Sequence, residues 1–251
     1  KNNLLFCSSL ASAYFHANQI ENSRNCYLHY LSQSPNDAKT WLALGNCHHT
    51  LNSNDEAETC WSKALQFDND LIGANINLGN CYLLRKDYIV AEQHYLLVLK
   101  QDPSHIDTLN NMGHLIAQRD NWAAAFPIFE QAFQVAPNDA TTLSNTANAL
   151  FHLGEIDLAE TCWLNALQQN EAMLSALTGL GHLHLSRSEY EIAEGYFQKA
   201  IDFHPHSAEA HNQLGNLYQK LRNWQDAESC YLKALSLETN YAHALFNLGL
   251  L

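Results

Sequence analysis

The chain has 251 residues, and its 26 acidic and 13 basic side chains give a formal net charge of −13 at pH 7. No run of 18 apolar residues is present, so the sequence predicts no membrane span. It also lacks a basic stripe of the kind that contacts phosphates, so nucleic acid is not an expected partner.

The sequence repeats with a period of 34 residues. Glycines recur at this spacing, with Ala147 in the one missing place: Gly45, Gly79, Gly113, Gly181, Gly215 and Gly249. A large aromatic residue recurs with the same period: Tyr27, Trp61, Tyr95, Phe129, Trp163, Phe197 and Tyr231. Several coincident series at one spacing indicate an array of stacked repeats.

Seven full repeats and a partial eighth cover residues 4–37, 38–71, 72–105, 106–139, 140–173, 174–207, 208–241 and 242–251. Each full repeat contains two helical patterns, which we name helix A and helix B. In the second repeat, Trp41, Leu44 and His48 mark helix A, and Trp61 and Ala64 mark helix B. About four polar residues separate the two helices, which therefore run antiparallel. The array begins at the edge of one repeat and stops within another, which predicts a segment of a longer protein.

Proline follows helix B in four repeats, where it is expected to end the helix. These residues are Pro35, Pro103, Pro137 and Pro205. Pro127 instead falls inside helix B of the fourth repeat. If that helix begins at Trp122 or Ala123, proline removes a backbone donor just past the first turn. The sequence therefore predicts a kink or a late helix start at Pro127.

The pattern Asn75-x2-Leu78-Gly79-x2-Tyr82, followed by Ala91-x3-Tyr95 and Pro103, resembles the tetratricopeptide repeat signature. The resemblance covers nearly the whole chain. It implies an all-α, right-handed superhelical solenoid, with residues 1–251 forming a single array. It also implies that the A helices line a concave groove.

Position within the repeat explains the cysteines and most of the charge. Cys26, Cys60, Cys162 and Cys230 share one place in helix B, and Cys47 and Cys81 share one in helix A. Equivalent places lie about 10 Å apart in packed helices, too far for disulfides. Small buried thiols in a reducing cytoplasm are therefore expected.

Most acidic residues lie near the start of helix B, where the helix dipole favours negative charge. The stretches of helix A that face the groove hold only Lys39, Lys220, Asp107 and Glu209, which sum to zero charge. We therefore expect a charge-neutral groove.

Amide and imidazole side chains recur at the sixth and ninth places of helix A. The sixth place holds Asn77, Asn111, Asn145, Gln213 and Asn247, and the ninth holds Asn46, Asn80, His114, Asn148, His182 and Asn216. The ninth place of one repeat should face the sixth place of the next. This predicts the rungs Asn46–Asn77, Asn80–Asn111, His114–Asn145, His182–Gln213 and Asn216–Asn247. Gly179 interrupts the series opposite Asn148 and leaves space there.

This ladder of amides has two interpretations. An amide carries both donors and an acceptor, which match the N–H and C=O of an extended peptide of any sequence. Asn at these places is also common in the family, and it can simply hydrogen-bond neighbouring helices. The carboxylate clamp of chaperone-binding members, with Lys or Arg at the second, fifth and sixth places, is absent, since only Lys39 stands at such a place.

Three functions follow as expectations. The first is a scaffold that binds an extended protein segment in the groove. The second is the substrate-recognition arm of a larger group-transfer enzyme, because the ladder resembles the superhelical arm of O-GlcNAc transferases. The third is self-assembly through the apolar end at Leu248–Leu251.

No catalytic or metal site is expected. The 14 histidines include His48 with His49 and His182 with His184, but neither spacing places two rings on one helix face. No nucleophile and base recur together, so we expect no catalytic residue and no cofactor.

Overall fold

The computed structural model describes residues 2–251, with side chains from residue 6 onward, and it contains only α-helices in this range. The helices are α1 (Asn2–His16), α2 (Ile20–Gln33), α3 (Ala38–Thr50), α4 (Asn54–Phe67), α5 (Ile72–Leu84), α6 (Tyr88–Gln101), α7 (Ile106–Ala117), α8 (Trp122–Val135), α9 (Ala140–His152), α10 (Ile156–Gln169), α11 (Leu174–Ser186), α12 (Tyr190–Phe203), α13 (Ala208–Lys220), α14 (Trp224–Leu237) and α15 (Ala242–Gly249). Odd-numbered helices are the predicted A helices, and even-numbered helices are the B helices.

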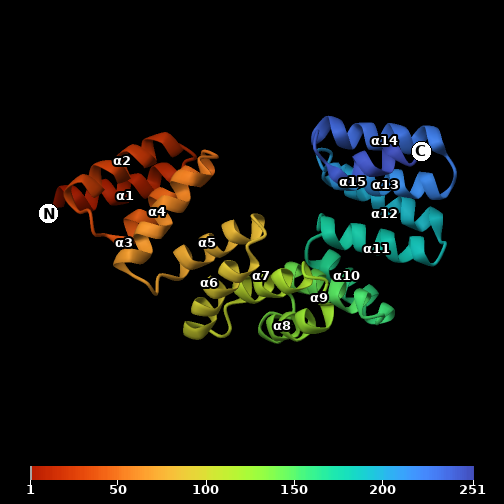
Figure 1. Cartoon of the computed structure of the whole chain (residues 1–251), viewed down its shortest axis with the longest axis horizontal. Coiled ribbons are helices and arrows are strands. Elements are labelled where there is room, and N and C mark those ends of the chain that lie inside the picture. The colour runs from red at the N-terminus through yellow and green to blue at the C-terminus, as the bar shows by residue number, and fades with distance from the viewer. Residues whose placement is uncertain (1) are drawn as a thin grey trace. The chain divides into compact units, whose positions relative to one another are not determined.

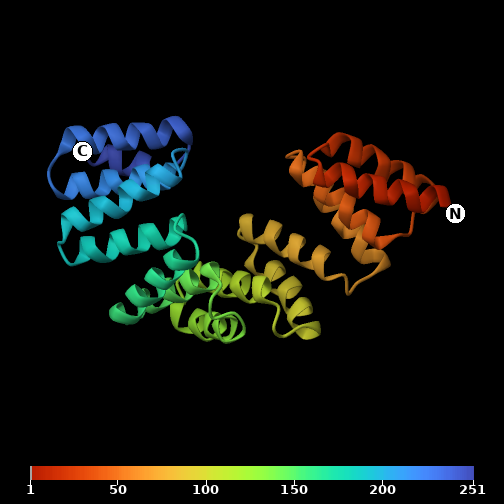
Figure 2. The same ribbon diagram turned by 180° about the vertical axis from the view of Figure 1, so that it is seen from behind.

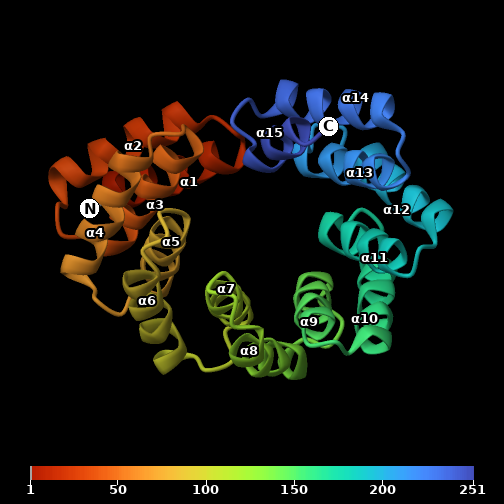
Figure 3. The ribbon, with the colours of Figure 1, turned by 45° about the vertical axis from the view of Figure 1, so that its right-hand side comes forward.

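The chain divides into two compact units, Lys1–Leu115 and Ile116–Leu251. In the first unit, helices pair in chain order as α1 with α2, α3 with α4, and α5 with α6 (Figure 1). In the second, α9 pairs with α10, α11 with α12, and α13 with α14, as the reverse view also shows (Figure 2). Within this second unit, α9, α11 and α13 follow one another along one face, and α10, α12 and α14 along the other (Figure 3). The all-α repeat architecture is confirmed, and the continuity of the array across residue 115 stays a prediction.

The turn after each of the first seven A helices contains one residue with a left-handed backbone, always at the fifteenth place of the repeat. The φ angles are Asn18 57°, Asn52 60°, Lys86 61°, Asp120 58°, Gly154 85°, Ser188 62° and Arg222 59°. This conformation lets the chain turn sharply into helix B and is favoured in glycine, because a Cβ is crowded there. Only Gly154 is a glycine, and the other six repeats have a different residue at this place. A search for glycines in the sequence therefore does not locate this turn.

The predicted proline stops are confirmed. Each of the four prolines stands two residues after the last residue of its B helix, as Pro103 does after Gln101. The alternative of a late start at Pro127 is wrong, because α8 begins at Trp122 and runs continuously through the proline. Pro127 lies on the exposed side of α8. The Ala123 carbonyl that loses its intrahelical donor can therefore bond to water.

Small residues facing a large aromatic ring form the core of each repeat. A Cβ added at Gly45 would stand 2.4 Å from Trp61 Nε1, and one added at Gly79 would stand 2.5 Å from Tyr95 Cε1. The ring therefore takes the space that a larger residue would need. Ala57, beside Trp61, is completely buried. The predicted fit of large against small residues is confirmed.

Two arginines join successive repeats through the acidic start of helix B. Arg85 Nη1 lies 2.6 Å from Glu58 Oε2 of the preceding repeat. Arg187 holds the same place in the sixth repeat, and its Nη1 lies 2.7 Å from Glu160 Oε2 of the fifth repeat. Some of the acidic charge thus pairs with the next repeat, in addition to its interaction with the helix dipole.

The cysteines are all free thiols, but they are less buried than expected. Only Cys47 and Cys60 are fully buried, and the other five are partly exposed. Burial raises the pKa of the Cys60 thiol to about 11. Three of the partly exposed thiols, Cys26, Cys162 and Cys230, lie in B helices, and the other two, Cys7 and Cys81, lie in A helices.

Candidate binding groove

Three of the predicted rungs are present as direct hydrogen bonds. In each, the amide nitrogen at the sixth place donates to the amide oxygen at the ninth place of the preceding repeat. The Nδ2···Oδ1 distances are 2.9 Å from Asn77 to Asn46, 2.9 Å from Asn111 to Asn80 and 2.8 Å from Asn247 to Asn216. Adjacent A helices are therefore connected by their amide side chains.

The ninth-place oxygen accepts a second hydrogen bond from the core aromatic of its own repeat. Trp61 Nε1 donates to Asn46 Oδ1 at 3.0 Å, and Tyr95 OH donates to Asn80 Oδ1 at 2.6 Å. Because an indole nitrogen can only donate, this contact fixes which end of the Asn46 amide faces the ring. Both lone pairs of that oxygen are then used within the protein.

The residue at the ninth place varies with the aromatic beside it. In four repeats Asn stands there and the aromatic has a polar hydrogen, in the pairs Asn46–Trp61, Asn80–Tyr95, Asn148–Trp163 and Asn216–Tyr231. His stands there where the aromatic is phenylalanine. His182 meets Phe197 edge to face, with 5.5 Å between ring centroids. A phenylalanine offers no donor, so an amide oxygen would lose its partner, whereas an imidazole can pack against the ring.

This pairing was not predicted from the sequence. It becomes visible when the residue at the ninth place of helix A is compared, repeat by repeat, with the core aromatic of helix B. It gives the ladder a structural role, since the ninth-place side chain anchors the aromatic of helix B. The second interpretation of the ladder, in which the amides hydrogen-bond neighbouring helices, thus holds for the three rungs that are present.

Several polar atoms of the ladder have no hydrogen-bond partner within the part of the chain that the structure describes. In the first unit, these are the donor Nδ2 atoms of Asn46 and Asn80 and the acceptor Oδ1 atoms of Asn77 and Asn111. All four side chains are half-buried. In contrast, Asn216 also uses its Nδ2, which donates to Gln213 Oε1 at 3.0 Å. The first unit therefore keeps more amide groups available for a partner.

The remaining predicted site residues fall into two groups. His182 and Gln213 share a hydrogen bond, and burial lowers the pKa of His182 while this bond partly offsets the shift. His114 lies in α7 at the end of the first unit and Asn145 lies in α9 of the second, so their rung stays a prediction.

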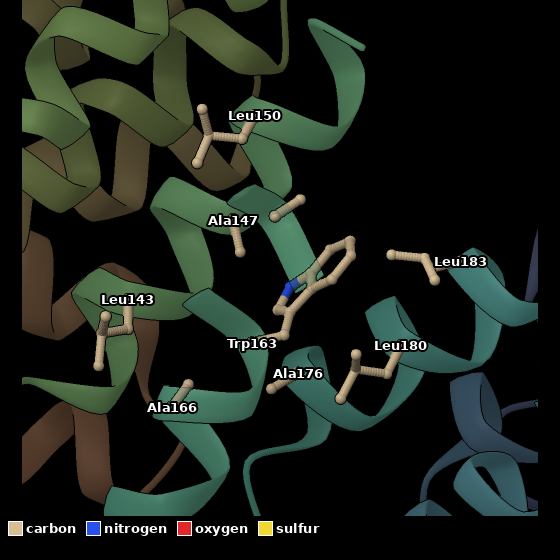
Figure 4. Close-up of a cluster of buried hydrophobic side chains, with 9 residues drawn as sticks. Leu143, Ala147, Leu150, Trp163, Ala166, Ala176, Leu180 and Leu183 are labelled. Carbon is tan, nitrogen blue, oxygen red and sulfur yellow. The ribbon is translucent and has the colours of Figure 1, made fainter. Parts of the chain in front are cut away.

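The interruption at Gly179 has a specific cause. Trp163 Nε1 donates to Asn148 Oδ1 at 3.1 Å, and a Cβ at Gly179 would stand 2.4 Å from Trp163 Cε2. The indole lies between α9 and α11, among the buried side chains of Leu150, Leu180 and their neighbours (Figure 4). The indole thus takes the position of the missing side chain itself, whereas an open groove borders both Asn148 and Gly179.

An open groove of about 640 Å³ runs along α11 in the second unit. Its middle is lined by Asn148, Gly179 and His182, and its ends by side chains of α8, α9 and α13. Glu209 and Lys220, both exposed, bring one charge of each sign. The groove is therefore polar at its centre and has no net formal charge, as the sequence predicts for the faces of the A helices.

No group of three or more His, Cys, Asp or Glu side chains able to hold a metal ion occurs in the described residues. None of the described helices is both long enough and apolar enough to cross a membrane.

The stacked antiparallel helix pairs define an α-helical repeat protein. Three family models, each described as a tetratricopeptide repeat, match residues 38–71, 173–204 and 208–241. Together with the fold, they show that the chain is a tetratricopeptide repeat protein. Proteins with this fold generally mediate protein–protein interactions and are typically non-catalytic scaffolds.

Solved structures show the same fold at low sequence identity. The chain resembles a protein in the APC/C hetero-tetramer Cut9–Hcn1, with a TM-score of 0.79, 18% identity, and coverage of 98% of this chain and 48% of that one. It resembles a tetratricopeptide repeat protein from Parabacteroides merdae ATCC 43184, with a TM-score of 0.83, 16% identity, and coverage of 100% and 99%. It also resembles PilF of Pseudomonas aeruginosa, with a TM-score of 0.65, 17% identity, and coverage of 86% and 98%. The chain thus spans about half the length of the first of these, and no curated protein matches it in sequence.

Proposed function

We propose that this chain binds an extended segment of a partner protein through the amide ladder of its A helices. The observation that carries the proposal is the set of unused amide atoms in the first unit. Asn46 and Asn80 each keep a donor, and Asn77 and Asn111 each keep an acceptor. An extended backbone offers the complementary acceptors and donors at every residue, independent of its side chains.

The internal bonds of the ladder support this proposal. Asn46, Asn80 and Asn216 are each held by the aromatic of their own repeat and by the next repeat, so they lose little conformational freedom when a partner binds. The outward groups are therefore fixed in place before binding. The zero net charge of the groove-facing stretches suits a peptide backbone, which is polar but uncharged.

The test uses twelve-residue peptides selected on the folded chain from a random phage-displayed library. Asn46→Asp with Asn80→Asp keeps the oxygen that Trp61 and Tyr95 need, but it replaces the outward donor with an acceptor. Two lost hydrogen bonds should weaken binding about tenfold or more. Asn165→Ala, an exposed change in α10, serves as the control.

Backbone chemistry gives an independent readout. Methylation of peptide nitrogens removes donors without changing side chains, so at least one such methylation should weaken binding to a similar extent. Full affinity of the methylated peptides, together with full affinity for the double Asp variant, would show that the ladder is not the binding site.

Self-association is a second candidate, and it is favoured by the surface of α15. Leu245 and Phe246 are 51% and 68% exposed, and Leu250 just after the helix is 60% exposed. A cluster of exposed large apolar side chains is a common feature of interaction surfaces. Light scattering at several concentrations should show a mass that rises with concentration, and Phe246→Lys should abolish the rise.

A further inference from the structure

The groove along α11 differs from the rest of the ladder, because Gly179 removes the amide from its centre. Its volume of about 640 Å³ lies within the roughly 300–1,000 Å³ range of ligand-binding clefts. Asn148 Oδ1 accepts one hydrogen bond, from Trp163, so its Nδ2 and one oxygen lone pair are left for a partner. Where the amide pair is missing, a side chain of the bound segment can enter.

One end of this groove is aromatic. The rings of Trp122 and His152 stack in parallel, with 3.9 Å between centroids and 6° between planes. Phe151 and Leu185 line the same end, near the last turns of α9 and α11. Flat, partly exposed rings of this kind favour contact with another aromatic side chain.

The two charges of the groove stand at opposite ends of α13. Glu209 is the second residue of this helix and Lys220 is its last. Eleven residues at 1.5 Å per residue separate them by about 16 Å along the axis, and they lie on the same helix face. Lys220 is at the aromatic end, because α9, α11 and α13 hold the same place in successive repeats and run in the same direction. Within the described residues, neither Glu209 nor Lys220 forms an ion pair.

We propose that this groove binds a short protein segment with an aromatic side chain next to an acidic one and a basic side chain about five residues away. The aromatic side chain packs against Trp122 and Phe151, the acidic group faces Lys220, and the basic group faces Glu209. At about 3.3 Å per residue, an extended chain spans the 16 Å between the two charges in about five residues. This inference rests on the proposed function and adds side-chain selectivity to it.

Four labelled hexapeptides of identical composition test the order of charges. KSASFE and its reverse EFSASK place Glu beside Phe, whereas ESASFK and its reverse KFSASE place Lys beside Phe. Using both chain directions makes the comparison independent of the direction in which the segment binds. Affinities are measured by fluorescence anisotropy at pH 8, where imidazoles are neutral, because His243 interacts electrostatically with Glu209.

The wild-type chain should bind the better Glu–Phe peptide at least about fivefold more tightly than either Lys–Phe peptide. The variant Glu209→Lys with Lys220→Glu should reverse this preference, and Phe→Ala in the preferred peptide should weaken binding about tenfold. Both residues are exposed, so the fold should survive the exchange, which a circular dichroism melt checks. An unchanged preference in the variant, equal affinity for all four peptides, or no measurable binding of any of them would overturn the inference.

These outcomes are separable from failure of the proposed function. The ladder test depends on Asn46 and Asn80 in the first unit, whereas the charge test depends on Glu209 and Lys220 in the second. If selected peptides need Asn46 and Asn80 but the hexapeptides show no charge preference, the ladder function stands and the selectivity of the α11 groove is wrong.

Discussion

The indole of Trp163 occupies the space that a side chain at Gly179 would need, since a Cβ there would stand 2.4 Å from Trp163 Cε2. In the second, third, sixth and seventh repeats, the core aromatic lies against a glycine of its own repeat, as Trp61 lies against Gly45. In the fifth repeat Ala147 stands at that place, and Trp163 packs in one cluster with Ala147 while its ring lies against Gly179 of the next repeat. The missing glycine and the interrupted ladder are thus two parts of one local change.

This relationship predicts opposite effects for two glycine substitutions. Gly179→Ala should reduce the free energy of unfolding by about 1–3 kcal/mol, because Trp163 is fully buried and cannot move aside freely. Gly195→Ala, on the open side of α12 with no atom within 4 Å of the new Cβ, should increase it by about 0.5–1 kcal/mol. Urea unfolding measures both, and equal effects would contradict the packing described here.

The left-handed residues that end the A helices predict a stabilising change. Ser188, with φ of 62°, lies in a conformation that crowds its Cβ. Ser188→Gly should raise the free energy of unfolding by about 0.5–1 kcal/mol. Removal of the Cβ relieves the crowding in the folded state, and the greater flexibility of glycine in the unfolded state offsets part of this gain. Ser188→Ala should give no gain, and the reverse change Gly154→Ala should destabilise. A gain with Ser188→Ala would assign the effect to the side chain and not to the backbone.

The pairing of Asn80 with Tyr95 predicts non-additive substitutions. Tyr95→Phe removes the donor to Asn80 Oδ1, a bond of 2.6 Å, and should cost about 1 kcal/mol of stability. Asn80→His in that background recreates the combination found at His182 and Phe197, so it should cost less than Asn80→His alone. A double-mutant cycle should give a coupling of at least about 0.5 kcal/mol. Strict additivity would show that the two positions are independent.

The half-buried His94 predicts a loss of stability in mild acid. Burial lowers the pKa of His94, which donates from Nδ1 to Asn75 Oδ1 at 2.9 Å and stacks on Tyr82. The folded protein therefore binds fewer protons at this site than the unfolded chain, whose imidazole titrates near pH 6.5. The contribution is present above that pH and is lost as the pH falls below it.

Urea unfolding at pH 7.5, 6.5 and 5.5 measures this dependence. The free energy of unfolding should fall over the lower half of the range, and His94→Gln should reduce the slope while lowering the value at pH 7.5. An unchanged slope in His94→Gln would assign the pH dependence to other groups.

The repeat and the packing within it could be predicted from the order of residues along the chain. Its period set the helix pairs, the proline stops and the contact of glycine with aromatic, because these depend on neighbours at fixed separations along the chain. The facing of Asn46 with Asn77 followed from the same regularity, since equivalent helices stack in register.

The hydrogen-bond partners of the individual side chains could be read only from the three-dimensional structure. In the structure, Asn46 Oδ1 accepts hydrogen bonds from both Trp61 and Asn77. The Trp163 ring lies against Gly179, and Glu209 and Lys220 line one groove. The structure also corrected the expected late start at Pro127, because the exposed face of α8 tolerates the missing donor. These outcomes depend on ring orientation and solvent access in three dimensions, which a pattern of residue types along the chain does not specify.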